Sequence, residues 1–256
     1  MIDVHPLLSL GCKSEMTVGL GMVSSSKAVK CHVVPGCKVV LRRFKDARGL
    51  VAALRDGEVD AAVRGTLSSS QVLVQLKKLF GLKEVMRTAI LESVQGKEFL
   101  LTPVGIDEGD TMSARLGLAK ATVSYFAPLK WKTSVGVLSK GRLEDSSRGA
   151  DIRKSVEDGE RIVRELKRRQ IPAGHYGILI EEAIRERNLL LAPDGVSGNL
   201  IFRSLHFLGE CKAFGAPVVN IDKVFLDTSR AKADFTESLL LAVGLAEAKH
   251  RLRRGA

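Results

Sequence analysis

The segment Asn188–Gly209, NLLLAPDGVSGNLIFRSLHFLG, constrains the fold more strongly than any other stretch of the chain. Its Leu189–Ala192 run is short and wholly apolar, which is typical of a strand buried on both faces. A loop with one acid and two glycines follows, and apolar residues then recur at helical spacing from Leu200 to Leu208. We therefore predict a buried strand, a turn over Pro193–Gly198, and a helix whose N-cap is Asn199.

A glycine-bearing turn from a strand into a helix is one way to bind an anion. The backbone N–H groups near Gly198 and Asn199 and the positive end of the helix dipole point toward one place, which suits a phosphate. The alternative is a tight turn without a ligand, and both interpretations remain open. The turn is neither a Walker loop nor a GxGxxG dinucleotide loop, because the residues that define those motifs are absent.

Strand-like and helix-like segments alternate along the rest of the chain, including an expected strand at Pro217–Asn220 and a final helix over Phe235–Arg254. Aromatic residues make up only 5% of the sequence, which favours packed parallel strands and helices over an all-β sandwich. With 256 residues, 45% of them hydrophobic, the chain suffices for one large or two small α/β domains. We expect mainly parallel sheets covered by helices on both faces.

A second strand–turn–helix unit begins at Gly57. Val59–Val63 is an expected strand, and the polar turn that follows contains Arg64, Thr66 and Ser68 before a helix that runs to Phe80. Ligands of open α/β sheets gather at the carboxyl ends of the strands, so these side chains are candidate ligands of a substrate phosphate. A serine-rich N-cap explains the serines equally well without any ligand.

The segment Ser139–Gly149 is a long polar loop, rich in glycine, serine and basic residues, at the end of an expected strand over Thr133–Leu138. It has too few apolar side chains to form a core of its own, so it is either a mobile surface loop or a lid over a site. Ser139 and Lys140 are the candidate substrate-binding residues of this loop.

The net charge is +11, which is compatible with a nucleic acid, an acidic partner or a phosphate-bearing ligand. Lysine and arginine are spread along the chain and cluster only within segments of helical pattern, where a solvated face is the common explanation. No zinc-finger, RNP or helix-turn-helix pattern accompanies them. We therefore expect no nucleic-acid partner and favour a small phosphate or thioester substrate.

The cysteines, Cys12, Cys31, Cys37 and Cys211, form no CxxC pair and no spacing typical of metal ligands, so we expect reduced structural thiols and no metal. The sequence also shows no apolar run long enough to cross a bilayer and no signal-peptide pattern near its start. These features predict a cytoplasmic protein without a membrane partner.

The order of several motifs resembles that of phosphotransacetylases and acyl-phosphate synthases. Gly57–Gly65 (GEVDAAVRG) is similar to a GEADA-V-SG segment, and Val135–Ser139 resembles a strand that ends in LS. Pro193–Asn199 (PDGVSGN) resembles a PDLNTGN loop, while Ala216–Asn220 with Asp227–Arg230 (DTSR) resembles a strand followed by DLSR. These segments occur in the same order and cover most of the chain.

More specifically, the chain resembles a marker family of methanogens named for the methyltransferase mtx subunit X, a divergent branch of the phosphate acetyl/butyryltransferase group. The resemblance implies an archaeal protein with the fold of phosphotransacetylases and isocitrate dehydrogenases. It implies a discontinuous domain over 1–95 and 218–256, an inserted domain over 96–217, a cleft between them, and a homodimer. Coenzyme A or an acyl phosphate would be substrates, with no tightly bound cofactor.

The resemblance also implies catalytic residues. Ser229 and Arg230 match the serine–arginine pair that lies at the reaction centre of the acetyltransferases, and Asp234 is the nearest match to a following acid. Asp194 is a second candidate for the base that removes the thiol proton, provided that burial raises its pKa. A capping role explains Asp194 equally well.

Acyl transfer from phosphate to a thiol requires that phosphate oxygens are neutralised and that a developing oxyanion is stabilised. Arg64 and Arg230 could clamp the phosphate, and Ser229 with the N–H groups of Gly198–Asn199 could hold the oxyanion. We therefore expect an acyl- or phosphate-transfer enzyme. The alternatives are a methyltransferase, for which we find no GxGxG turn, and a non-catalytic regulatory protein of methanogenesis.

Overall fold

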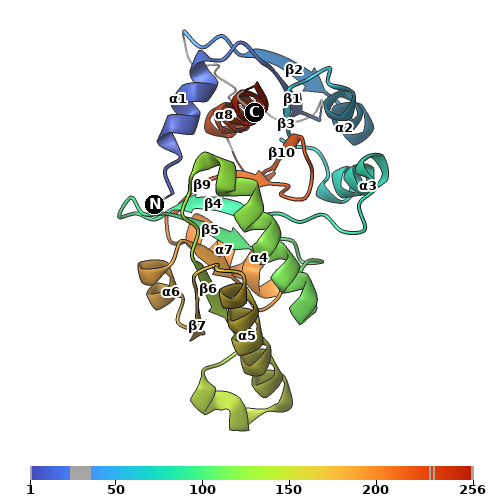
Figure 1. The fold of residues 1–256 in the computed structure, drawn as a ribbon. Helices are drawn as coiled ribbons and strands as arrows, with labels where there is room; N and C mark the ends of the chain where they lie inside the picture. Colours follow the sequence, from blue (N-terminus) through green and yellow to red (C-terminus); the bar gives the residue numbers. More distant parts are fainter. Residues whose placement is uncertain (1, 24–35, 231, 233, 255–256) are drawn as a thin grey trace. The chain divides into compact units, whose positions relative to one another are not determined.

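The structure is a computed structural model that describes residues 2–23, 36–230, 232 and 234–254 (Figure 1). The chain forms two compact units: a terminal unit of residues 3–85 and 214–256, and a central unit of residues 86–213 together with residue 2. The boundary that we placed at 95/96 falls in the turn between two strands that pair with each other. The division expected at 217/218 lies four residues from the division of the structure, which follows Ala213.

The terminal unit contains the helices and strands that come from both ends of the chain. They are α1 (His5–Lys13), β1 (Thr17–Gly21), β2 (Val40–Phe44), α2 (Ala47–Asp56), β3 (Ala61–Val63), α3 (Ser69–Phe80), the last residues of β9 (Lys212–Pro217), β10 (Val224–Asp227) and α8 (Thr236–Arg254). The strands lie in the order β2-β1-β3-β10-β9, and β2, β1, β3 and β10 are parallel. Only β9 is antiparallel to its neighbour β10.

Helix α2 shows how local sequence sets the bounds of an element. Asp46 accepts a hydrogen bond from the Gly49 N–H at 2.8 Å and so caps the first turn. Gly57 ends the helix in the left-handed region, with φ of 78°, where an L side chain would be strained. Leu50, Val51 and Leu54 are buried in the core of the terminal unit, so one face of this helix points inward.

Helices α1 and α8 lie side by side in the terminal unit (Figure 1). Glycines allow their backbones to approach closely. A Cβ at Gly11 would collide with Leu240 O, and a Cβ at Gly244 would collide with Leu7 O. Cys12 of α1 forms a disulfide with Cys37. The expectation of reduced thiols is therefore wrong for this pair, because the fold brings together two cysteines that show no paired spacing in the sequence. Cys211 is a free, buried thiol, and Cys31 lies outside the described residues.

The central unit contains the remaining elements in an alternating order. They are β4 (Ala89–Glu92), β5 (Glu98–Thr102), α4 (Met112–Phe126), the 3-10 turn η1 (Ala127–Leu129), β6 (Val135–Leu138), the 3-10 turn η2 (Leu143–Arg148), α5 (Ala150–Arg168), β7 (Ala173–Gly177), α6 (Ile180–Glu186), β8 (Leu189–Leu191) and α7 (Gly195–Phe207). The strand order is β4-β5-β8-β6-β7, in which only β4 is antiparallel to its neighbour.

Opposite faces of β6 are covered by different helices. A Cβ at Gly136 would meet Ala183 of α6 at 3.2 Å, so that face of the strand packs on α6. His175 of the neighbouring strand β7 lies against Gly159 of α5, on the other face. Because side chains alternate between the faces of a strand, β6 is sandwiched between two helices, and its residues are all buried.

These observations confirm the predicted α/β class with mainly parallel strands. The strand expected at Pro217–Asn220 is misplaced, because residues 212–217 form β9 and the next strand, β10, begins at Val224. The apolar run of β10 is only Val-Phe-Leu, which is too short to identify a strand from the sequence. Within the described residues, no helix has the length and apolarity that a membrane span requires.

Candidate functional site

The carboxyl ends of the parallel strands of the central unit surround a cavity of about 600 Å³. Segments that follow β5, β6, β7 and β8 all contribute to it, which is where open α/β sheets bind their ligands. Its volume is within the range of small-molecule sites. The lining residues are Asp110, Leu138, Ser139, Lys140, Ile178, Ile180, Pro193, Asp194, Val196, Ser197 and Ile201.

The strand–turn–helix segment that we singled out forms one wall of this cavity. Strand β8 is fully buried as predicted, but α7 begins at Gly195, five residues before the expected start. Asp194 is its N-cap and accepts the Ser197 N–H at 2.7 Å, so the assignment of Asn199 as the cap is wrong. Capping by Asp194 leaves only the first N–H groups of the helix, at Gly195 and Val196, without an intrahelical acceptor.

The glycines of this turn serve a close approach between two backbones. A Cβ at Gly195 would collide with Gly105 O, and a Cβ at Gly198 would collide with Pro103 O. The Asn199 amide donates to Val104 O at 2.9 Å, which holds the same helical turn on the same loop. The Gly198 N–H donates to Asp194 O at 3.0 Å. In this structure the Gly198 N–H is therefore engaged by Asp194 O, while the two glycines and the Asn199 side chain pack the start of α7 on residues 103–108.

A buried ion pair between Arg87 and Glu108 stabilises the loop of residues 103–108. The Glu108 carboxylate accepts hydrogen bonds from Arg87 Nε at 2.6 Å and from Gly105 N at 3.2 Å. Burial raises the pKa of Glu108 even though Arg87 opposes the shift. Arg87 is 6% exposed and Glu108 3%, so the pair fixes the floor under the first turn of α7 and lies away from solvent.

Asp194 faces Lys140 across the cavity, with Asp194 Oδ2 and Lys140 Nζ 3.8 Å apart. Partial burial of the Asp194 carboxylate would raise its pKa, but hydrogen bonds from Ser197 and the charges of Lys140 and Arg115 lower it overall. The condition that we set for Asp194 as a base, a raised pKa, is therefore not met. An ionised Asp194 can instead accept hydrogen bonds from a ligand hydroxyl or amine.

Ser139 directly follows strand β6, is 2% exposed and lines the cavity. Its Oγ lies 2.8 Å from His175 Nε2 and donates to Gly141 O at 2.7 Å. Sequence reasoning missed His175, because the short segment AGHYG of β7 contains two glycines and no apolar alternation. Gly159 in the middle of α5 is the signal that was available, since a glycine inside a charged helix marks the close approach of another group.

The loop after Ser139 is structured. Leu143–Arg148 forms the 3-10 turn η2, which packs against α5 (Figure 1). Asp145 holds it by accepting the Arg142 N–H at 2.9 Å and pairing with Arg148 at 3.1 Å. The Lys140 N–H donates to Ser155 Oγ of α5 at 3.0 Å, so the residues next to the cavity are tied to that helix as well.

In the terminal unit, Arg64 is buried directly after β3, and each of its three guanidinium nitrogens donates a hydrogen bond. Its Nε donates to Asp227 Oδ1, its Nη2 donates to Thr228 O, and its Nη1 donates to Leu67 O at 2.8 Å. The side chain of Arg64 is 7% exposed and that of Asp227 is 14% exposed. This arrangement fixes the loop after β3 to the end of β10, which is parallel to it.

The other predicted residues of the terminal unit follow the same strands. Thr66 Oγ1 accepts the Val23 N–H at 3.0 Å, and Ser68 Oγ lies 3.0 Å from Ser70 Oγ at the start of α3. Ser229 is half-buried and Arg230 exposed, directly after β10. Asp234 accepts hydrogen bonds from Thr236 N at 2.8 Å and Thr236 Oγ1 at 2.6 Å at the start of α8. The predicted residues thus divide between the units, with Asp194, Ser139 and Lys140 meeting at the cavity of the central unit.

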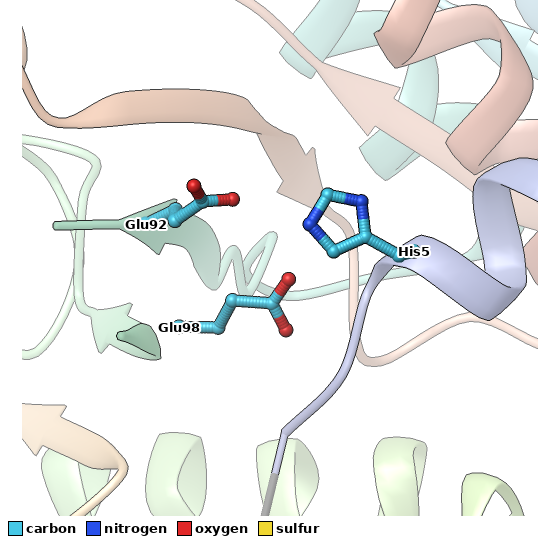
Figure 2. Close-up of side chains that lie close together, drawn as sticks. All are labelled: His5, Glu92 and Glu98. Carbon is cyan, nitrogen blue, oxygen red and sulfur yellow. The ribbon is translucent and has the colours of Figure 1, made fainter. Parts of the chain in front are cut away.

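Two acidic side chains of the central unit form a pair away from that cavity. Glu92 and Glu98 lie opposite each other on the antiparallel strands β4 and β5 (Figure 2). Glu98 is buried and Glu92 is half-buried. His5, which is also drawn in Figure 2, begins α1 and belongs to the terminal unit. Two carboxylates alone do not define a metal site, and we assign none to them.

Comparison with known sequences places the chain among proteins of methanogens, although no family model matches it. The "Putative methyltransferase mtx subunit X" of Methanosarcina barkeri is 46% identical over 188 residues, which are 73% of this chain and 69% of that protein. The chain belongs to the mtx subunit X family. A second relative, an "Uncharacterized methyltransferase" of Methanopyrus kandleri, is 40% identical over 211 residues, which are 80% of this chain and 82% of that protein.

The fold of this mtx subunit X family member is that of phosphotransacetylases. A branched-chain phosphotransacylase of Enterococcus faecalis superposes with a TM-score of 0.65 over 91% of this chain and 98% of its own, at 15% identity. A phosphotransacetylase of Streptococcus pyogenes gives a TM-score of 0.63 over 98% and 100% of the two chains, at 12% identity. A 4-hydroxythreonine-4-phosphate dehydrogenase of Klebsiella pneumoniae gives 0.54 over 96% and 85%, at 8% identity. At these identities the likeness establishes the fold alone.

Proposed function

We propose that the protein is a transferase that moves an acyl group between phosphate and a thiol such as coenzyme A, and that its cavity in the central unit holds one of these substrates. The observation that carries the proposal is the convergence of Ser139, Lys140 and Asp194 on one cavity at the carboxyl edge of parallel strands. The phosphotransacetylase fold of the chain and the transferase names of its relatives are consistent with it.

The lining of the cavity suits a substrate with an apolar body and a few polar groups. Ile178, Ile180, Val196 and Ile201 supply apolar surface. Lys140, with 47% of its side chain exposed, supplies a positive charge for a phosphate or a thioester oxygen. Asp110 and Asp194 can accept hydrogen bonds from ligand hydroxyls, as acidic residues do for ribose in other α/β folds.

Ser229 and Arg230 remain in the proposal as the catalytic pair that the family resemblance implies. An exposed arginine directly after a strand is free to reorient toward a phosphate, whereas the donors of Arg64 are already occupied within the terminal unit. A homodimer and a cytoplasmic location also remain proposals, and sedimentation equilibrium of the purified protein tests the first.

A methyltransferase is the second candidate, because the related proteins of Methanosarcina barkeri and Methanopyrus kandleri carry that name. Coenzyme A and S-adenosylmethionine share an adenosine moiety, which has the apolar ring and the hydroxyls that the cavity lining suits. Binding to the cavity does not by itself separate the two donors, so the transferred group must be measured.

The test is isothermal titration calorimetry with coenzyme A, acetyl phosphate, inorganic phosphate and S-adenosylmethionine, followed by assays of thioester formation and methyl transfer. Lys140→Ala should weaken binding of the active donor about tenfold or more, because a charge-assisted contact is worth about 1.5–3 kcal/mol. Lys120→Ala is the matched control, since Lys120 is exposed on α4 outside the cavity. Binding that is equal in the two variants would place the substrate elsewhere, and absence of both transfer activities would refute the proposal.

A further inference from the structure

The strand register explains why Ser139 and His175 meet. Val137 of β6 is paired with His175 of β7, so their side chains are on the same face of the sheet. Ser139 follows Val137 by two residues and returns to that face, diagonally opposite His175. The register shifts between Val137 and Leu138, and the Ser139 N–H donates to Gly177 O at 2.9 Å. This irregularity places the hydroxyl beside the imidazole where the two strands end.

The Ser139 hydroxyl has one hydrogen and two neighbouring acceptors. Gly141 O lies 2.7 Å from Oγ, and His175 Nε2 lies 2.8 Å from it. When Nε2 carries a proton, it donates to Oγ and the hydroxyl donates to Gly141 O. When Nε2 is unprotonated, the hydroxyl can donate to the imidazole instead, which is the arrangement of a serine nucleophile and its base.

The surroundings of His175 make that second arrangement accessible. Within the described residues, the ring has no hydrogen-bond partner other than Ser139, so its other nitrogen is not committed as an acceptor. Burial lowers the pKa of His175, although the charge of Glu160 on α5 opposes the shift. This shift favours the neutral imidazole, and a neutral imidazole that carries its proton on Nδ1 presents a lone pair at Nε2.

The ring is also held in place by packing. A Cβ at Gly159 would lie 2.8 Å from His175 Nε2, so only a glycine at this position of α5 leaves room for the imidazole. Ser139 in turn lines the cavity next to Lys140. The pair therefore combines a fixed base, a hydroxyl within hydrogen-bond reach of it, and a ligand-sized space with a nearby cation.

We propose that Ser139 and His175 are a nucleophile and general base, and that Ser139 carries the transferred acyl group as a serine ester between the two substrates. The inference rests on the proposed function for the identity of the acyl donor, but the reactivity of the serine does not depend on it.

The reaction consists of two balanced half-reactions. Ser139 Oγ bonds to the carbonyl carbon of the acyl phosphate while its proton passes to His175 Nε2. The bond from that carbon to the phosphate oxygen then breaks, and the phosphate leaves with the bonding electrons and takes the proton from the imidazolium, so that His175 is neutral again. The acceptor thiol then gives its proton to His175 as its sulfur attacks the serine ester. The bond to Oγ breaks, and the serine regains a proton from the imidazolium. Lys140 can stabilise the oxyanion in both steps.

A serine-reactive fluorophosphonate tests the pair without any knowledge of the natural substrate. Oγ displaces fluoride from phosphorus in this reaction, and the histidine takes the proton. At pH 7.5 we expect labelling of the wild type at Ser139, located by peptide mass spectrometry, and none in Ser139→Ala. His175→Gln should react at least about 100-fold more slowly, since a positioned general base contributes about 10²–10⁴-fold. His206→Gln, at another half-buried histidine of the central unit, is the matched control and should keep the wild-type rate.

The pH dependence provides a second measurement if His175→Gln does not fold. The labelling rate of the wild type should rise with pH through a midpoint below 6.5 and then remain level, because only the neutral imidazole accepts the proton. Unlabelled Ser139 in the wild type, or a rate that keeps rising tenfold per pH unit above pH 7, would overturn the proposal. Transfer activity without serine labelling contradicts this inference alone, whereas labelling without any transfer activity contradicts the proposed function alone.

Discussion

Arg64 and Asp227 end two neighbouring parallel strands, and their side chains form a buried ion pair between β3 and β10. Arg64 also donates to the carbonyl groups of Leu67 and Thr228, so its side chain ties two loops of the terminal unit together. A residue that we predicted as a phosphate ligand from its position after a strand thus donates to protein acceptors from all three of its guanidinium nitrogens. An arginine in such a position needs partners to offset its desolvation, and the acid of the adjacent strand supplies one.

Removal of either partner of this pair should destabilise the protein strongly. Asp227→Asn and Arg64→Met should each cost about 3–5 kcal/mol of unfolding free energy, because each leaves an uncompensated buried charge or polar group. The double variant should lose less than the sum of the single variants. Urea unfolding, monitored by circular dichroism, measures the three values. Single-variant losses below about 1 kcal/mol would show that the pair is not important for the fold, and would return Arg64 to the list of candidate ligands.

The cap of α7 should make a measurable, pH-dependent contribution. Asp194→Ala should cost about 1 kcal/mol at pH 7, because the Ser197 N–H loses its acceptor. The pKa of Asp194 is lowered in the folded state, so its contribution is fully present above pH 3.8, its ordinary value, and is lost as the pH falls through the lower folded value.

Asp194→Ser separates capping from charge, since a serine can cap the helix but does not titrate near pH 4. The serine variant should be nearly as stable as the wild type at pH 7, and its stability relative to the alanine variant should not change between pH 5 and pH 3. Unfolding free energies of the three proteins across this range check the prediction. An alanine variant as stable as the wild type would contradict it.

Gly198 should tolerate no side chain. A methyl group there would collide with Pro103 O, so Gly198→Ala should destabilise the protein by about 1–3 kcal/mol by forcing α7 away from the loop beneath it. Gly117→Ala is the matched control within α4, because its Cβ would meet nothing closer than Met86 at 3.7 Å. That change should stabilise the protein by about 0.5–1 kcal/mol through helix propensity. Thermal melts of both variants measure these effects. If Gly198→Ala changed the melting temperature in the same way as Gly117→Ala, the close-packing explanation would be refuted.

The disulfide between Cys12 and Cys37 should stabilise the terminal unit. It closes a loop with a sequence separation of 25 residues, for which chain entropy gives about 3.5 kcal/mol. Dithiothreitol should therefore lower the melting temperature of the oxidised wild type, and should leave that of the Cys12→Ser/Cys37→Ser variant unchanged. Free-thiol titration of the purified protein checks that the bond is present at the start. A melting temperature that is insensitive to reductant would argue against a structural role.

The fold class and several local features of this protein follow from its amino-acid sequence. Apolar runs such as Leu189–Leu191 indicated buried parallel strands, and Asp46 with Gly57 marked both ends of α2, because these signals depend only on neighbouring residues. The motif order was sufficient to indicate the family to which the chain belongs. Ser139, Lys140 and Asp194 were also found from the sequence, since residues that follow parallel strands gather at one edge of a sheet.

The contacts between these residues, in contrast, are set by the three-dimensional packing. Gly198 appeared suited to a phosphate, but the backbone of residues 103–108 occupies the space beside it, and Asp194 rather than Asn199 caps the helix. The register between β6 and β7 places His175 beside Ser139. Arg64 pairs with Asp227, which is 163 residues away in the sequence. Contacts of this kind join segments far apart in the chain, so their energies depend on a packing that no local pattern encodes.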